Sequence, residues 1–359
     1  MNSNNQNLFG QWQPPAHWQT ITSLDCHTGG EPLRIITSGF PVLKGKSILA
    51  MRRDCLNNHD HLRTALMFEP RGHSDMYGAI ITPAEREDSD FGVIFMHNEG
   101  YSTMCGHAMM ALVRASIEAG VVKTVMPTTC IKIDAPCGQI TAYADIQNTQ
   151  IARIYFDNVA SFVAKDRLRL PVKGIGEVEF TLAYGGAFYA YVDATPIQLS
   201  LAMENHQQII DYGMRIKAAV MASEHNQWIK HPYEADLSFL YGTIFYAPVP
   251  DPAIHSRNVC IFAEGELDRS PTGSGVSGRA AILVSRGELK LQDSITIESI
   301  VGSRFQVTAL KTCTYGDNSA IIPRVAGDAC VIGKNTFYIN PDDPFSAGFA
   351  FSRGAVSVR

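Results

Sequence analysis

Cys105 is the residue whose surroundings point most clearly to chemistry. It lies in a glycine turn within YSTMCGHAMMALVRASIEAG (residues 101–120), two positions before His107 and in front of a run with helical spacing. A free cysteine is usually a small buried core residue. At a helix N-terminus beside a histidine, however, the pKa of a thiol falls from about 8.5 and the thiolate becomes accessible. We therefore expect Cys105 to be reactive, and His107 to tune the thiol or to orient a substrate.

A metal site is a weaker interpretation of the same motif. Cys-x-His supplies two ligands, and the sequence offers no convincing partner pair at zinc spacing. His59 and His61 flank one aspartate, but such pairs are usually found on solvated loops. We expect neither a metal nor another cofactor.

The segment around Cys105 is repeated later in the chain. When residue n is placed over residue n + 167, residues 93–120 align with residues 260–287. Both segments have the pattern of an apolar strand, a polar loop, a glycine turn, a helix rich in small residues and a glycine suited to the C-terminal cap. The identical pairs are Ile94/Ile261, Phe95/Phe262, Glu99/Glu266, Gly106/Gly273 and Gly120/Gly287. The repeat predicts two similar halves, with a small-ligand site in the cleft between them.

Thr272 occupies the position of Cys105 in the second half. The pairs Gly106-His107 and Gly273-Ser274 follow at the two predicted helix starts, where free N–H groups and the helix dipole favour an anion such as a carboxylate. Asp268 is either a loop or N-cap residue or an acceptor for a ligand ammonium group, and we favour the second role. The residues Gly185, Gly186, Phe188 and Tyr189 fit a turn into a strand and a pocket wall equally well.

The composition is that of an ordinary globular protein. The 359 residues include 30 basic and 35 acidic side chains, and no basic patch or polybasic run suggests nucleic acid or a membrane surface as a partner. No uninterrupted apolar run reaches the ~18 residues of a membrane span. The eight cysteines form no CxxC motif, which indicates free thiols in a reducing cytosol. We interpret residues 1–15 as a polar leader and not a signal peptide, so a cytoplasmic location is expected.

Short apolar, β-branched runs bounded by turn residues predict that strands dominate the fold. These runs are PLRIITS, YGAIITP, FGVIFMH, CIKIDA, ARIYFDNV, AFYAYVDA, NVCIFAEG and CVIGKNTFYI. Helical patterns are fewer. They cover residues 61–70, 103–120, 197–224 (as one helix or two) and 270–287.

Five segments together resemble the proline racemase family, from about residue 20 to the C-terminus. They are MCGHA, DRSPTGSG, DCHTGGEPLRI, GGAFYAYVD and DPFSAGF. The family includes proline racemases, 4-hydroxyproline 2-epimerases and trans-3-hydroxy-L-proline dehydratases. The resemblance implies an α+β fold of the diaminopimelate-epimerase type, with two pseudo-symmetric lobes, each a β-barrel-like sheet wrapped around a central helix. It also implies a cofactor-independent enzyme that acts at the α-carbon of a cyclic imino acid.

The resemblance further implies where the lobes begin and end. Residues 1–158 with 343–359 would form the first lobe, which carries Cys105. Residues 159–342 would form the second lobe, which carries Asp268 and Thr272. The active site would lie in the cleft between the lobes and take a small imino acid; whether the chain forms a homodimer stays open.

The sequence departs from the racemases and epimerases of this family at Thr272. Those enzymes carry a second cysteine there, which exchanges a proton on the opposite face of the substrate. A threonine hydroxyl titrates far too high to act as that acid or base near neutral pH. Cysteine in the first motif with threonine in the second resembles the trans-3-hydroxy-L-proline dehydratases.

The expected reaction is therefore a hydro-lyase reaction. Trans-3-hydroxy-L-proline would lose water to give Δ2-pyrroline-2-carboxylate and then Δ1-pyrroline-2-carboxylate. Cys105 would be the α-proton base, and Thr272 would lie near the non-reacting face. The substrate carboxylate would be held by the backbone amides of Gly106, His107, Gly273 and Ser274. His107 and Asp268 would hold the ring nitrogen.

Two alternatives stay open. The first is a 4-hydroxyproline 2-epimerase or proline racemase that uses Cys105 together with a second proton donor that is not a cysteine. The second is an imino-acid binding protein without catalysis, which would suit a chain that had lost both thiols better than one that keeps Cys105.

Overall fold

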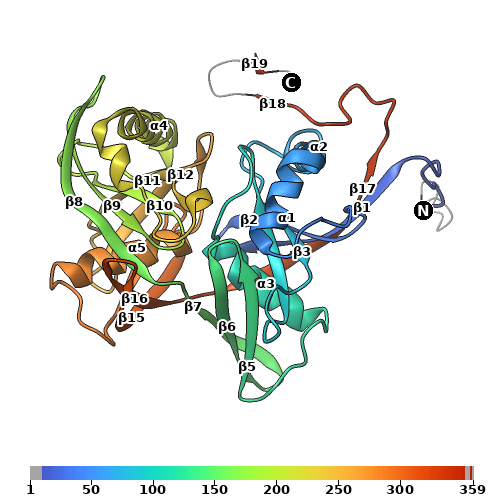
Figure 1. The fold of residues 1–359 in the computed structure, drawn as a ribbon, viewed down its shortest axis with the longest axis horizontal. Coiled ribbons are helices and arrows are strands. Elements are labelled where there is room, and N and C mark those ends of the chain that lie inside the picture. The colour runs from blue at the N-terminus through green and yellow to red at the C-terminus, as the bar shows by residue number, and fades with distance from the viewer. Residues whose placement is uncertain (1–9, 352–355, 358–359) are drawn as a thin grey trace, which may run out of the picture.

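The protein is described by a computed structural model that covers residues 10–351 and 356–357. The first nine residues of the expected polar leader lie outside the described residues. The predicted α+β fold with two pseudo-symmetric lobes is confirmed, and Figure 1 shows the lobes side by side.

The first lobe is a sheet wrapped around helix α3 (Gly106–Glu118). This helix contacts β1, β2, β6, β7 and β17, and it is buried from Gly106 through Val113 because strands enclose it on several sides. The strands are β1 (Gln19–Thr28), β2 (Glu31–Ser38), β3 (Gly78–Thr82), β4 (Phe91–Met96), β5 (Thr128–Ala135), β6 (Gly138–Gln147), β7 (Gln150–Asp157) and β17 (Ala329–Ile339). Outside the sheet lie α1 (Ile48–Asp54), the π-helix η2 (Cys55–His59) and α2 (Asp60–Met67).

The second lobe repeats this plan around helix α5 (Gly273–Ser285), which contacts β8, β9, β10, β15 and β16. The strands are β8 (Ser161–Val172), β9 (Gly176–Tyr184), β10 (Phe188–Asp193), β11 (Leu240–Ala247), β12 (Ser256–Phe262), β13 (Glu266–Leu267), β14 (Ser294–Glu298), β15 (Arg304–Tyr315) and β16 (Asn318–Gly327). The outer helices are α4 (His206–Ala222) and the 3-10 turns η3 (Met203–Asn205), η4 (Glu224–Trp228) and η5 (Ala235–Leu237). The short strands β18 (Ala350–Phe351) and β19 (Val356–Ser357) pair near the C-terminus.

The internal repeat is confirmed in register. Helices α3 and α5 are both 13 residues long, and they begin at the equivalent glycines Gly106 and Gly273. In each half the strand after the helix runs parallel to a strand that precedes it, as β5 does to β4 and β14 does to β12. The apolar run, the glycine turn and the small residues therefore encode one strand–helix–strand unit twice.

The chain returns to the first lobe earlier than expected. We expected the chain to rejoin the first lobe near residue 343, but β17 already pairs with β1 along Ala329–Ile339, where it completes the sheet around α3. The boundary near residue 158 stays a prediction, since β16 pairs with both β7 and β8. The helix predicted within residues 197–224 is confirmed only from His206, and α1 was not predicted because its seven residues are too short for a clear periodic pattern.

The N-termini of the two central helices meet backbone to backbone. A Cβ atom added to Gly106 would lie 2.4 Å from the Cα of Gly273, and one added to Gly273 would lie 2.5 Å from the Cα of Gly106. Such separations are far below a normal van der Waals contact. Glycine is therefore required at both positions if the helix ends are to touch.

We expect Gly106→Ala to lower the free energy of unfolding by roughly 1–3 kcal/mol, because the added methyl group overpacks a backbone contact that cannot relax by a side-chain rotation. The midpoint of urea unfolding measures this change. Gly100→Ala is the matched control, since a Cβ there meets nothing within 4 Å. A Gly106→Ala protein that unfolded at the wild-type midpoint would contradict the helix-to-helix contact.

Candidate active site

A small internal cavity lies where the N-terminus of α3 meets that of α5. Its volume is about 10 Å³, which is about the room that one water molecule needs. A five-membered ring can therefore enter only if the lobes move apart. The cavity is lined by Tyr77, Met104, Cys105, Gly106, His107, Tyr189, Tyr241, Phe262, Asp268, Thr272, Gly273 and Ser274. Every residue to which the sequence assigned catalysis or substrate binding is among them, whereas Gly185, Gly186 and Phe188 are not.

The two helix starts present unpaired backbone amides at this cavity. The hydrogen-bond ladder begins with the N–H of Met109 in α3 and with the N–H of Val276 in α5. The earlier amides fall outside the ladder, as at any helix start. They include those of Gly106, His107, Gly273 and Ser274. Two positive helix ends thus converge on one point, an arrangement that suits a carboxylate.

Cys105 is the N-cap residue of α3, and its backbone is extended, with φ at -143°. Its sulfur lies 3.1 Å from Nδ1 of His107, and both residues are buried. The His107 ring also packs edge-on against Tyr77, with the ring centres 4.9 Å apart. The sulfur, the imidazole and the phenol therefore form one cluster at the wall of the cavity.

The expected lowering of the Cys105 pKa is wrong. Burial raises the pKa of the thiol well above its usual value, and the carboxylates of Asp268 and Glu31 raise it further; hydrogen bonds from the Ala108 amide and the Tyr77 side chain lower it. His107 does not help as a cation, because burial lowers its pKa to about 3. The helix start does favour the thiolate, as predicted, but desolvation outweighs it.

Thr272 and Asp268 form the second-lobe wall of the cavity. The Thr272 hydroxyl donates to Oδ2 of Asp268 at 2.7 Å, and Oδ1 of Asp268 accepts the Ser270 amide at 2.7 Å. Burial raises the pKa of Asp268 to about 6, against the hydrogen bonds that it accepts. Thr272 has φ at +67°, a left-handed conformation that costs a β-branched residue roughly 1–3 kcal/mol. The hydrogen bonds to Asp268 and Ser270 hold it there.

A second cysteine lies behind Thr272. Cys260 is fully buried on β12, and its pKa is raised chiefly by burial and then by Asp268, while the nearby Thr272 side chain lowers it. Its carbonyl accepts the Asp268 amide at 3.0 Å. No pattern in the sequence distinguishes this cysteine from the other buried ones.

Most of the aromatic residues that line the cavity could not be identified from the sequence. Tyr77 precedes β3 and Tyr241 lies on β11, and no local motif marks either residue. The Tyr77 hydroxyl hydrogen-bonds with that of Ser102 and lies 3.3 Å from that of Tyr241. Only the fold brings these hydroxyls together, because Tyr241 comes from the other lobe.

The stretch from Gly185 to Tyr189 serves as both a turn and a wall. Tyr189 lines the cavity, and its hydroxyl lies 2.7 Å from that of Ser274. Gly186 accepts the Thr103 hydroxyl at 2.7 Å through its carbonyl, which ties the lobes together. Phe188 points into the separate second-lobe core. The sequence left open whether this stretch is a turn into a strand or a pocket wall. Tyr189 forms part of the wall, whereas Gly185 and Gly186 before it form the turn.

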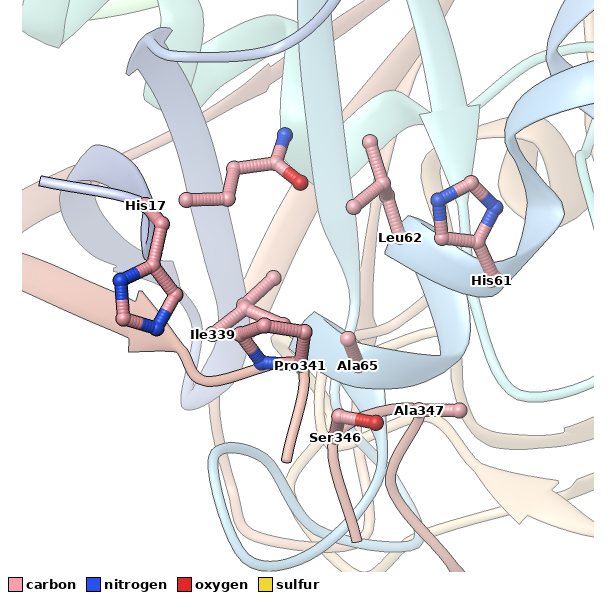
Figure 2. A pocket seen from close by; sticks show the side chains of 9 residues that line it. His17, His61, Leu62, Ala65, Ile339, Pro341, Ser346 and Ala347 are labelled. Atoms are coloured by element: carbon pink, nitrogen blue, oxygen red, sulfur yellow. The ribbon is translucent and has the colours of Figure 1, made fainter. Parts of the chain in front are cut away.

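A larger pocket lies elsewhere, between α2, β1 and the segment after β17 (Figure 2). It measures about 430 Å³, and its lining includes His17 and His61 on opposite sides. None of the predicted site residues lines it. The small cavity is the better candidate active site, because it combines a thiol, a neutral imidazole and two helix starts.

Within residues 10–351 and 356–357, no group of three or more His, Cys, Asp or Glu side chains is arranged to hold a metal ion. None of the helices in that part of the chain is long and apolar enough to cross a membrane. All eight cysteines are free, in agreement with their irregular spacing.

Comparison with known proteins gives close relatives along almost the whole chain. A trans-3-hydroxy-L-proline dehydratase from Colwellia psychrerythraea is 56% identical over 345 residues, which cover 95% of this chain and 96% of that protein. A 3-hydroxyproline 2-epimerase from Burkholderia multivorans is 41% identical and covers 92% of this chain and 98% of its own.

The fold has a solved counterpart as well. The crystal structure of a hydroxyproline epimerase from Agrobacterium vitis, with trans-4-hydroxy-L-proline bound, matches with a TM-score of 0.86 at 28% identity and covers 93% of this chain and 96% of its own. The family profile described as proline racemase matches residues 23–350. Together with the two lobes and the paired helix starts, these matches establish that the chain belongs to the proline racemase family.

Proposed function

We propose that this protein dehydrates trans-3-hydroxy-L-proline to Δ1-pyrroline-2-carboxylate. The observation that carries the proposal is the asymmetry of the cavity, with the thiol of Cys105 at one helix start and the hydroxyl of Thr272 at the other. A hydroxyl that donates to a neighbouring carboxylate is no base at neutral pH. The 56% identical relative that is named as this dehydratase supports the same reaction.

The stereochemistry of the substrate explains why one thiol suffices. In trans-3-hydroxy-L-proline the hydroxyl and the carboxylate lie on opposite ring faces, so the α-hydrogen and the hydroxyl share a face. A thiolate on that face takes the α-proton, and the C3–O bond then breaks on the same side. The first product, Δ2-pyrroline-2-carboxylate, tautomerises to the Δ1 form. Every step is a proton transfer or the loss of water, so the reaction requires no redox cofactor.

The surrounding groups have separate tasks. The converging amides of Gly106, His107, Gly273 and Ser274 stabilise the charge that develops on the carboxylate as the α-proton leaves. Asp268 accepts from the ring nitrogen, whose positive charge also favours the nearby thiolate. The small cavity leaves little room for water, which strengthens these interactions. The substrate is a free small molecule, and a cytoplasmic location suits the free thiols.

An epimerase is the second candidate, because a relative of 41% identity is named as a 3-hydroxyproline 2-epimerase. Inversion needs a proton donor on the face opposite Cys105. Thr272 lines the cavity on the second-lobe side, but its hydroxyl donates to Asp268, and the buried Cys260 does not line the cavity. Proton exchange at C2 with inversion and without loss of water would favour this candidate.

We expect Cys105→Ser to lower the dehydration rate by roughly 10²- to 10⁴-fold, because a serine hydroxyl does not ionise near neutral pH. Proton NMR in D2O measures the loss of trans-3-hydroxy-L-proline and the appearance of the pyrroline product, with L-proline and trans-4-hydroxy-L-proline run in parallel. Cys130→Ser, at an exposed cysteine, is the control. Dehydration at the wild-type rate by the Cys105→Ser enzyme would contradict the assignment of Cys105 as the α-proton base.

We expect kcat/KM for dehydration to rise with pH through the neutral and weakly alkaline range. The base is the thiolate, and burial raises the pKa of Cys105, so the active form grows as protons are removed. The rate of Cys105 alkylation by iodoacetamide in the absence of substrate should follow the same pH dependence. A plateau of both profiles by pH 7 would contradict the raised pKa.

We expect Thr272→Cys to gain C2 proton exchange with inversion on trans-4-hydroxy-L-proline, because a second thiol then faces Cys105 across the ring. Chiral chromatography of the product in D2O, with mass spectrometry for deuterium, detects the gain. Thr272→Ser is the matched control, since it keeps a hydroxyl. Equal epimerase activity in the wild type and in Thr272→Cys would show that another group already supplies the second proton.

A further inference from the structure

We propose that Tyr77 is the catalytic acid that delivers a proton to the departing hydroxyl and recovers one from the Cys105 thiol. The proposal rests on the proposed dehydration and adds the residue that lets hydroxide leave as water. It is carried by the position of the Tyr77 side chain, which lines the cavity beside Cys105 and hydrogen-bonds with two further hydroxyls.

The acid must lie on the face of the substrate that Cys105 occupies, since the leaving hydroxyl shares that face with the α-hydrogen. Tyr77 and Cys105 belong to the same lobe and line the same small cavity. Both pack against His107, whose ring centre lies 4.9 Å from that of Tyr77 and whose Nδ1 lies 3.1 Å from the Cys105 sulfur. The phenol and the thiol are therefore on the same side of the cavity. Thr272 and Asp268 come from the opposite helix start and face each other in a hydrogen bond.

His107 is the other group near the sulfur, but it is the weaker acid of the two. The ring is neutral, since burial lowers its pKa to about 3. The N–H of a neutral imidazole is a much weaker acid than a phenol, so Tyr77 is the better proton donor for the leaving hydroxyl.

The hydroxyl network around Tyr77 fits a proton donor. A phenol has one proton and two acceptor lone pairs. Ser102 and Tyr241 can both donate to the Tyr77 oxygen, which leaves its own proton for the sulfur or for the substrate. The same two donors stabilise the phenolate in the moment after the proton leaves. Tyr241 belongs to the second lobe, so the network is complete only when the lobes are closed.

The proton transfers balance. The Cys105 thiolate takes the C2 proton, and the C2–H electron pair moves toward C2 and the carboxylate. That pair forms the C2=C3 bond as the C3–O bond breaks, and the departing oxygen takes the Tyr77 proton to leave as water. The Tyr77 phenolate then takes the proton from the Cys105 thiol. The enzyme returns to thiolate and phenol, and the substrate has lost one water molecule.

A substrate whose leaving group needs no proton distinguishes a catalytic role of Tyr77 from a structural one. Chloride leaves without a proton, so trans-3-chloro-L-proline needs the base but not the acid. We expect Tyr77→Phe to lower kcat on trans-3-hydroxy-L-proline by roughly 100-fold or more and to eliminate HCl from the chloro substrate within about fivefold of the wild-type rate. Efficient HCl elimination also shows that the variant is folded.

Two further variants make the test decisive. Tyr241→Phe removes a donor to Tyr77 and should give a smaller loss that is again confined to the hydroxy substrate. Tyr184→Phe removes another buried phenol, outside the cavity and without a hydrogen-bond partner, and should change neither rate. Equal losses on both substrates, or none on the hydroxy substrate, would overturn the proposal for Tyr77. A wild-type enzyme that eliminated HCl but did not dehydrate trans-3-hydroxy-L-proline would instead overturn the proposed function, and with it the role of Tyr77.

Discussion

The rest of this structure depends on the contact between Gly106 and Gly273. Two helices, each enclosed by the strands of its own lobe, approach end to end until their first glycines touch. The contact brings two sets of unpaired amides and two positive helix ends to one point. It also places the residue before each glycine at the cavity, so that Cys105 and Thr272 face the same small volume. A side chain at either glycine would separate these groups.

The symmetry of the lobes makes the differences at the two helix starts informative. Cys105 has an ordinary extended backbone, whereas Thr272 is held in a left-handed conformation by its bonds to Asp268 and Ser270. The first-lobe side of the cavity carries a thiol and a phenol. The second-lobe side carries a hydroxyl whose proton is bound to a carboxylate. Such a site can act on one face of a ring and hold the other face still.

Burial determines how easily the Cys105 thiol ionises. It also means that a substrate can enter only when the lobes move apart. The cavity is too small for a substrate, and the thiol in it resists ionisation because it is desolvated near carboxylates. Several bonds hold the lobes in this state. The Arg269 amide donates to Glu31 and the Asn98 amide donates to Glu266, each across the lobe interface. A cationic ring nitrogen that enters this environment reduces the cost of the thiolate, so the substrate itself helps to activate the base.

The sequence by itself determined the repeated unit and the positions of the key residues. The apolar run, the glycine turn and the small helical residues fix local structure through backbone freedom and periodicity, so α3 and α5 begin at the glycines that the alignment paired. The exchange of cysteine for threonine also needs no coordinates, because the acidity of each side chain is a chemical property. Only the tertiary structure decided the rest. Tyr77 and Tyr241 are far apart in the chain and carry no local pattern, and their hydroxyls meet because two lobes close. The sign of the Cys105 pKa shift was likewise out of reach, since desolvation depends on how much of the whole fold surrounds the sulfur, not on the helix start beside it.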